Sequence, residues 1–179
     1  MMDTKKRLQG FGDSKFTVAV YIEKRPPMAP WQTLNFLHAM QAGEINSINQ
    51  ACGNGWRKVF NVYAKVLFAL PSEHFKFAKQ ACDWQTFRDD LLLQANSCTA
   101  LLFSPPLLDV SNQLHIIAGR THAKKLIQSG QLNSPLTWID DEFAISKSDK
   151  VIVCPYFDYR QLSNSKIARL SQLVADILA

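Results

Sequence analysis

A strand, a glycine and a helix start follow one another in the segment Ala118-Gly119-Arg120-Thr121-His122. The first N–H groups of a helix have no intrahelical acceptor, and the helix dipole makes them electropositive. Since cationic side chains add to this potential, the segment predicts a site for an anion such as a phosphate. The residues expected to hold it are Gly119, Arg120, Thr121 and His122. The alternative is a tight turn in which Thr121 caps the helix.

A second unusual segment, residues 155–164, reads Pro-Tyr-Phe-Asp-Tyr-Arg-Gln-Leu-Ser-Asn and follows a buried strand. Aromatic rings beside an arginine are suited to stacking on a base or another planar ligand. The residues expected to do so are Tyr156, Phe157, Tyr159 and Arg160. The alternative is a folded loop whose aromatic rings close the end of the sheet and whose last residues cap a helix.

Two carboxylates are candidates for acid or base chemistry, Glu23 after the first strand and Asp158 in the aromatic loop. A third acid, Asp109, leaves open a hydrolase that acts on a small anion. The four histidines and four cysteines show no metal-ligand spacing, and no nucleophile-elbow motif occurs. We therefore expect no metal site and no cofactor.

Short all-apolar runs predict strands at residues 16–22, 99–103, 114–118 and 151–154. Apolar residues at helical spacing predict helices at 31–40, 56–70, 121–129 and from 163 or 164 to the end, with further helical sequence between 72 and 95. Residues 136–145 form a further candidate strand. Fully apolar strands that alternate with amphipathic helices are typical of a mainly parallel sheet covered on both faces.

The predicted fold class is therefore α/β, a three-layer α/β/α sandwich. We expect a flexible tail over residues 1–14 and a single domain over 15–179. Ligands of such sheets bind outside the carboxyl ends of the strands. This rule predicts one cleft formed by residues 23–30, 104–109, 119–122 and 155–164.

Composition narrows the classes of protein further. The 179 residues are 47% hydrophobic and 20% charged, which excludes a disordered or fibrous chain. No apolar run approaches the length of a membrane-spanning helix, and no signal-peptide core follows the basic N-terminus, so we expect a cytoplasmic protein without a membrane partner. The formal net charge of +5 favours anionic partners.

Three segments of the second half resemble the uracil-DNA glycosylase superfamily: residues 101–104, 116–123 and 151–155. The resemblance implies a compact α/β/α fold that receives a flipped base in a pocket at the end of the sheet, with Ser104 beside the ligand. The chain departs from that family, which has Asn in place of Ser104 and His-Pro in place of Cys154-Pro155. Ordinary uracil excision is therefore not expected.

Besides the hydrolase, these observations leave two classes of function. The first is the binding of a nucleotide or nucleic-acid-like anion in the cleft. The second is a non-catalytic interaction domain, in which residues 155–162 anchor a protein partner or a second copy of the chain, because Tyr and Arg are favoured at interfaces.

Overall fold

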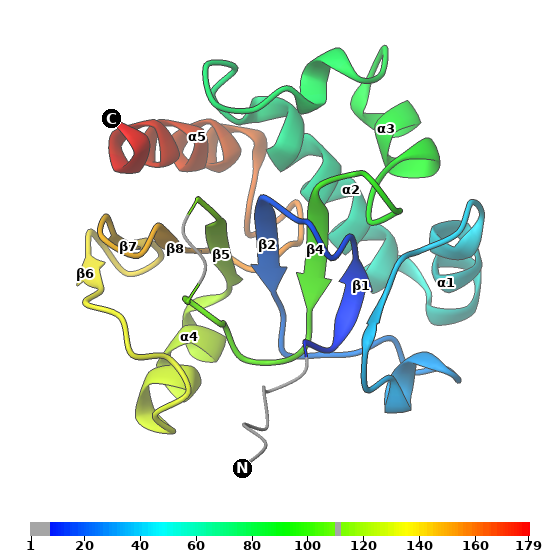
Figure 1. The fold of residues 1–179 in the computed structure, drawn as a ribbon, viewed down its shortest axis with the longest axis horizontal. Helices are drawn as coiled ribbons and strands as arrows, with labels where there is room; N and C mark the ends of the chain where they lie inside the picture. The colour runs from blue at the N-terminus through cyan, green and yellow to red at the C-terminus, as the bar shows by residue number, and fades with distance from the viewer. Residues whose placement is uncertain (1–7, 110–111) are drawn as a thin grey trace.

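One eight-stranded sheet organises the computed structural model, which describes residues 8–109 and 112–179 (Figure 1). The strand order across the sheet is β3-β1-β4-β2-β5-β8-β7-β6. In chain order the strands are β1 Gly10–Gly12, β2 Val18–Tyr21, β3 Leu37–His38, β4 Thr99–Leu102, β5 Leu114–Ala118, β6 Thr137–Trp138, β7 Ala144–Ser146 and β8 Val151–Cys154. The α-helices are α1 Glu44–Cys52, α2 Asn54–Ala69, α3 Trp84–Asp90, α4 Arg120–Gln128 and α5 Asn164–Leu178, with short 3₁₀ helices η1 Trp31–Thr33 and η2 Phe77–Lys79.

The four central strands β4, β2, β5 and β8 are parallel. Their carboxyl ends therefore lie at one edge of the sheet, the lower edge in Figure 1. Antiparallel strands flank this parallel centre, since β1 pairs with β4 and β7 pairs with β8. The sheet is thus mixed, with a parallel core that sets the position of four loops.

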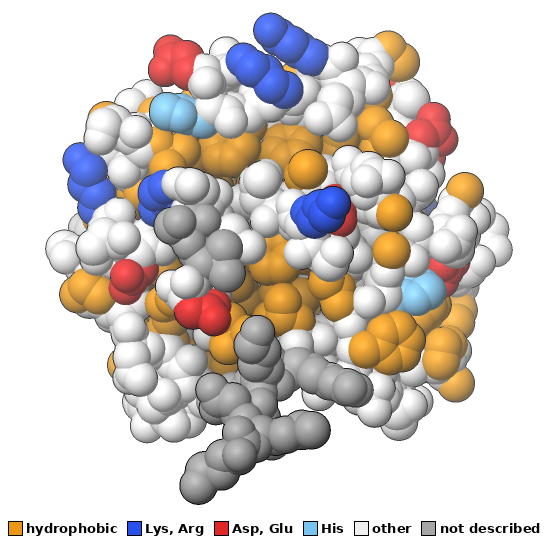
Figure 2. Space-filling model, in the orientation of Figure 1, with side chains coloured by type: hydrophobic (Ala, Val, Ile, Leu, Met, Phe, Trp, Pro, Cys, Tyr) orange, Lys and Arg blue, Asp and Glu red, His pale blue; other side chains and the backbone are white. Residues whose placement is uncertain are grey.

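Helices pack against both faces of the sheet. On one face, Val18, Val20 and Ile116 share a core with residues of α1, α2, α3 and α5. On the other face, Ala19 and Tyr21 pack with α4 and with neighbouring loops. Alternate residues of the same strand thus enter different cores, which explains why the strands are apolar throughout. The structure therefore confirms a mixed α/β fold. Figure 2 shows hydrophobic side chains at the surface over the central strands in the view of Figure 1.

Several predicted elements are confirmed with small shifts of their ends. The apolar stripe over 56–70 forms α2, the segment 121–129 forms α4, and Ser163 precedes α5 as its N-cap residue. The candidate strand over 136–145 is a hairpin of β6 and β7 instead of one strand. The acidic residues 140–142 form its turn, which explains why they interrupt the apolar pattern.

Two expectations about the first half of the chain are wrong. Residues 31–40 do not form an α-helix: only Trp31–Thr33 is helical, as η1, and Leu37–His38 pairs with β1 as strand β3. Part of the predicted tail over residues 1–14 is the strand β1, while residues 1–7 lie outside the described residues. Phe11 of β1 is fully buried. Added Cβ atoms on Gly10 and Gly12 would lie 2.2 Å and 2.4 Å from carbonyl oxygens of β4, so this strand requires glycine.

Across the described parts of the chain, each helix is too short or too polar to cross a bilayer.

Candidate functional site

A cleft of about 630 Å³ lies at the carboxyl edge of the parallel strands. It is lined by the segments that follow β2, β5 and β8, together with the turn between β6 and β7. The lining residues are Glu23, Lys24, Ala118, Gly119, Arg120, Thr121, His122, Asp141, Glu142, Pro155, Tyr156 and Gln161. Three of the four predicted loops therefore contribute to one cleft, and the loop after β4 does not.

Gly119 joins β5 to α4 at the floor of the cleft. Its φ of 101° favours glycine, and its N–H donates to the Cys154 carbonyl at 2.8 Å. An added Cβ on Gly119 would lie 3.8 Å from Tyr156 Cβ, so the chain runs directly beside the tyrosine. The glycine thus brings the start of α4 and the segment after β8 together on the same floor.

The first turn of α4 faces the cleft. Arg120, Thr121 and His122 occupy this turn, where helix geometry leaves backbone N–H groups without an intrahelical acceptor. The N-cap residue Gly119 has no side chain to accept from them. Arg120 is exposed, and one of its guanidinium nitrogens donates to the Asp141 carbonyl at 3.2 Å. The remaining guanidinium donors and the helix dipole make this end of the cleft electropositive.

Glu23 and His122 form the ionisable part of the cleft. A hydrogen bond from Lys125 Nζ to Glu23 Oε1 at 2.8 Å lowers the pKa of Glu23, with His122 and Lys24 adding to the effect. Burial lowers the pKa of His122, and the charge of Glu23 only partly opposes this. At neutral pH the cleft therefore contains an ionised Glu23 and a neutral His122, which can accept a proton from a ligand.

Two acidic residues that were not predicted from the sequence line the side of the cleft opposite β2. Asp141 and Glu142 come from the turn between β6 and β7, which α5 holds in place through two ion pairs. Lys166 binds Glu142 at 2.8 Å, and Arg169 binds Asp140 at 2.6 Å. The turn lies at this edge because β7 runs antiparallel to β8. The acids between two short apolar runs were the only sequence signal for it.

Half of the aromatic loop faces away from the cleft. Phe157, predicted to stack on a ligand, is fully buried with its ring centroid 5.8 Å from that of Tyr63. It is therefore part of the core. Asp158 binds Lys58 of α2 at 3.5 Å instead of joining Glu23. The loop thus places only Tyr156 and Gln161 in the cleft, together with the buried Pro155 at its base.

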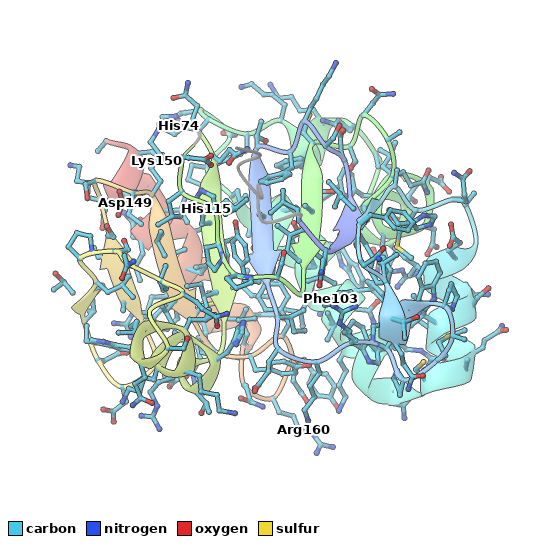
Figure 3. The ribbon with its side chains drawn as sticks, turned by 60° about the horizontal axis from the view of Figure 1, so that its bottom comes forward. His74, Phe103, His115, Asp149, Lys150 and Arg160 are labelled. Atoms are coloured by element: carbon cyan, nitrogen blue, oxygen red, sulfur yellow. The ribbon has the colours of Figure 1, made fainter. Side chains whose placement is uncertain are left out.

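Tyr159 and Arg160 are exposed at the outer surface beside α2. The guanidinium carbon of Arg160 lies 5.8 Å from the centre of the Tyr159 ring. Figure 3 shows Arg160 projecting outward, clear of the sheet. These two residues were expected in the cleft, but they line a different part of the molecule.

Ser104 lies at the same edge of the sheet but does not line the cleft. Its hydroxyl accepts a hydrogen bond from the Gln9 N–H at 3.0 Å. The half-buried Arg25 packs over the neighbouring Phe103 at 5.2 Å and donates to the Leu34 carbonyl at 2.6 Å. The segment after β2 is therefore fixed against β4, so that Glu23 and Lys24 turn toward β5.

The arrangement combines amide donors, one guanidinium, the Lys24 ammonium and a neutral imidazole with three carboxylates. Two of these carboxylates already have a lysine partner, so Arg120 and the amides of α4 are the groups best placed to bind an added anion. Tyr156 is half-buried beside them, and burial raises the pKa of its hydroxyl, which stays a donor. Within residues 8–109 and 112–179, His, Cys, Asp and Glu side chains form no cluster of three or more that could hold a metal ion.

Searches of curated proteins and of solved structures found no significant match to this chain. A protein-family profile does match it, over residues 9–175. This range includes all the strands and the whole cleft. The chain therefore belongs to the family of unknown function DUF6942.

Proposed function

We propose that the cleft binds a nucleotide or a related phosphate-bearing anion. The observation that carries the proposal is the first turn of α4, whose N–H groups and Arg120 face a 630 Å³ cleft at the carboxyl ends of parallel strands. The phosphate would bind at Gly119, Arg120, Thr121 and His122. The half-buried Tyr156 ring would contact the planar part of the ligand.

The polar side of the cleft suits the rest of a nucleotide. Asp141, Glu142 and Gln161 offer acceptors for sugar hydroxyls or for the amino groups of a base. His122 is the one group suited to act as a base, because its imidazole is neutral at pH 7. Glu23 is less suited, since its lowered pKa makes it a weak base.

The proposal is binding without base excision. The resemblance to uracil-DNA glycosylases implies that their reacting groups correspond to Ser104, Cys154 and Glu23. Glu23 lines the cleft, but the other two do not take the family's roles. Ser104 does not line the cleft, and Cys154 is fully buried. Any reaction in this cleft would therefore depend on other side chains, of which His122 is the first to test.

Isothermal titration with nucleoside monophosphates, nucleoside triphosphates and inorganic phosphate tests the proposal. We expect binding that weakens as NaCl rises from 20 to 200 mM, and a loss of about tenfold or more in Arg120→Ala, since hydrogen bonds to charged groups contribute about 1.5–3 kcal/mol. Lys147→Ala is the matched control, because Lys147 lies in the turn between β7 and β8, at the other edge of the sheet. Undiminished affinity in Arg120→Ala would refute the proposal.

A second candidate is a protein-interaction domain that uses residues 155–162. The supporting observation is the 52% exposure of Tyr159, which is high for an aromatic side chain. In that case a molar mass that rises with concentration would indicate self-association as a homodimer. Tyr159→Ala would then restore the monomer, as measured by light scattering, whereas Arg120→Ala would not.

A further inference from the structure

The outward face of α2 carries a stripe of cations and amides. Asn54, Arg57, Asn61 and Lys65 recur at intervals of three or four residues, so they lie along one side of the helix. The opposite side is buried in the core. The α2 sequence contains three cationic residues and no acidic one. This face therefore presents a line of positive charge over about three helical turns.

A groove of about 230 Å³ runs along this stripe. The loop after β8 forms its other wall by contributing Tyr159. The lining residues are Asn54, Arg57, Lys58, Asn61, Val62, Lys65 and Tyr159, and none of these described residues is a carboxylate. Asp158 binds Lys58 from outside the groove and offsets one of its three charges. Arg57 and Lys65 remain directed to the groove, with Asn61 between them.

Two aromatic rings accompany the cations. Lys58 Nζ lies 4.9 Å from the centre of the Tyr159 ring, and Lys65 Nζ lies 5.1 Å from the centre of the Trp84 ring. Lys58 and Lys65 are seven residues apart, which is about 10.5 Å along a helix. Trp84 lines a neighbouring hollow that shares Lys65 with the groove. The two ring-and-cation pairs therefore belong to one continuous surface.

We propose that this surface, the α2 groove, binds single-stranded nucleic acid. Arg57 and Lys65 would contact phosphates, while Tyr159 and Trp84 provide rings on which bases stack. An acidic peptide would use the cations but would gain nothing specific from two spaced aromatic rings. The combination of both features favours a polynucleotide.

The α2 groove is distinct from the cleft at the carboxyl edge. The lining residues of the two hollows do not overlap, and the loop after β8 gives Tyr156 to the cleft but Tyr159 to the groove. The inference therefore does not depend on the proposed nucleotide site. Variants at Arg120 and at Arg57 separate the two.

Fluorescence anisotropy with a labelled 20-nucleotide oligo(dT), at 30 to 200 mM NaCl, tests the proposal. We expect saturable binding whose log–log salt slope is about −1.4, as two phosphate contacts on a single strand predict, because Asp158 already offsets Lys58. Arg57→Glu with Lys65→Glu should abolish it. Lys147→Glu with Lys15→Glu is the matched control, because these lysines precede the parallel strands β8 and β2 and neither lines the groove. It makes the same charge change and should weaken binding less than threefold. Circular dichroism confirms that each variant is folded.

The aromatic contribution is tested by Tyr159→Ala, which should weaken binding about tenfold, and by Tyr159→Phe, which keeps the ring and should not. No binding at 30 mM NaCl would overturn the proposal. So would an equal loss in both charge-reversal variants, which would indicate only non-specific attraction. Equal competition by poly-glutamate together with an unchanged affinity in Tyr159→Ala would overturn it in favour of an acidic protein partner. Loss in Arg120→Ala alone would place the oligonucleotide in the cleft instead.

Discussion

Replacing the buried His115 should remove a large part of the loss of stability at mildly acidic pH. His115 lies in β5 with 1% of its surface exposed, and a hydrogen bond of 2.7 Å joins its Nδ1 to the Tyr21 hydroxyl. Burial lowers the pKa of His115 from 6.5 to about 4, although the charges of Asp149 and Asp109 partly oppose this. Figure 3 shows His115 on its strand, with Asp149 at the same end of the sheet. The imidazole is therefore neutral in the folded protein at pH 7.

The magnitude follows from the two pKa values. Below pH 6.5 the unfolded chain binds a proton at His115, whereas the folded chain binds this proton only near pH 4. The free energy of unfolding therefore decreases as the pH falls from 6.5 to about 4. The full shift of the His115 pKa corresponds to a loss of about 3 kcal/mol in the free energy of unfolding. Between pH 7 and pH 5 it amounts to about 2 kcal/mol.

The assay is urea unfolding followed by tryptophan fluorescence at pH 7 and pH 5, for the natural chain and for His115→Asn. The asparagine amide can still form a hydrogen bond with the Tyr21 hydroxyl in either direction, but it does not titrate. The variant should be less stable at pH 7, yet it should lose about 2 kcal/mol less on going to pH 5. His122, whose pKa burial also lowers, is present in both proteins and cancels. Equal losses in the two proteins would refute a neutral buried His115.

Four further substitutions test the packing described above by the same urea assay. Phe157→Ala should lower the free energy of unfolding by about 3–5 kcal/mol, because the ring is fully buried. A change below about 1 kcal/mol would contradict a core position for Phe157 and favour a ligand-binding role. Gly12→Ala should destabilise the protein by roughly 2–4 kcal/mol, because the added Cβ would clash with the backbone of β4. Gly55→Ala is its control in α2, where an added Cβ would have no neighbouring atom within 4 Å, and it should stabilise the protein by up to about 1 kcal/mol. Lys125→Ala should change stability by less than about 1 kcal/mol, since its pair with Glu23 is exposed; a larger loss would show that the pair holds the loop after β2 in place.

The parts of the fold that the sequence predicts well are those determined locally. Three strands are apolar on both faces, as expected for strands of a parallel sheet that is covered on both sides. These are Val18–Tyr21, Leu114–Ala118 and Val151–Cys154. Strand β1 has no such signal, because Gly-Phe-Gly reads as a loop. Its strand character comes from two partners, β3 and β4, and β4 lies about ninety residues further along the chain. The same pairing overrides the helical spacing of residues 31–40.

The sequence likewise predicts some residues of the candidate site and not others. Glu23, the start of α4 and Tyr156 follow directly from the rule that parallel strands share a carboxyl edge. The directions of Phe157, Tyr159 and Arg160 depend instead on a turn at Asp158. The Asp158 carbonyl accepts from the N–H groups of Gln161 and Leu162, both at 2.8 Å, and its carboxylate accepts from Arg160 N–H. No spacing rule distinguishes which ring such a turn buries.

Strand length at the two borders of the sheet bears on how the protein behaves at high concentration. The outermost strands, β3 and β6, contain two residues each. An edge strand this short offers few backbone hydrogen bonds to a strand of another molecule, so it is a poor template for the addition of further strands and the growth of fibrils. The apolar strands most prone to such growth are enclosed at the centre, where both of their sides are already occupied.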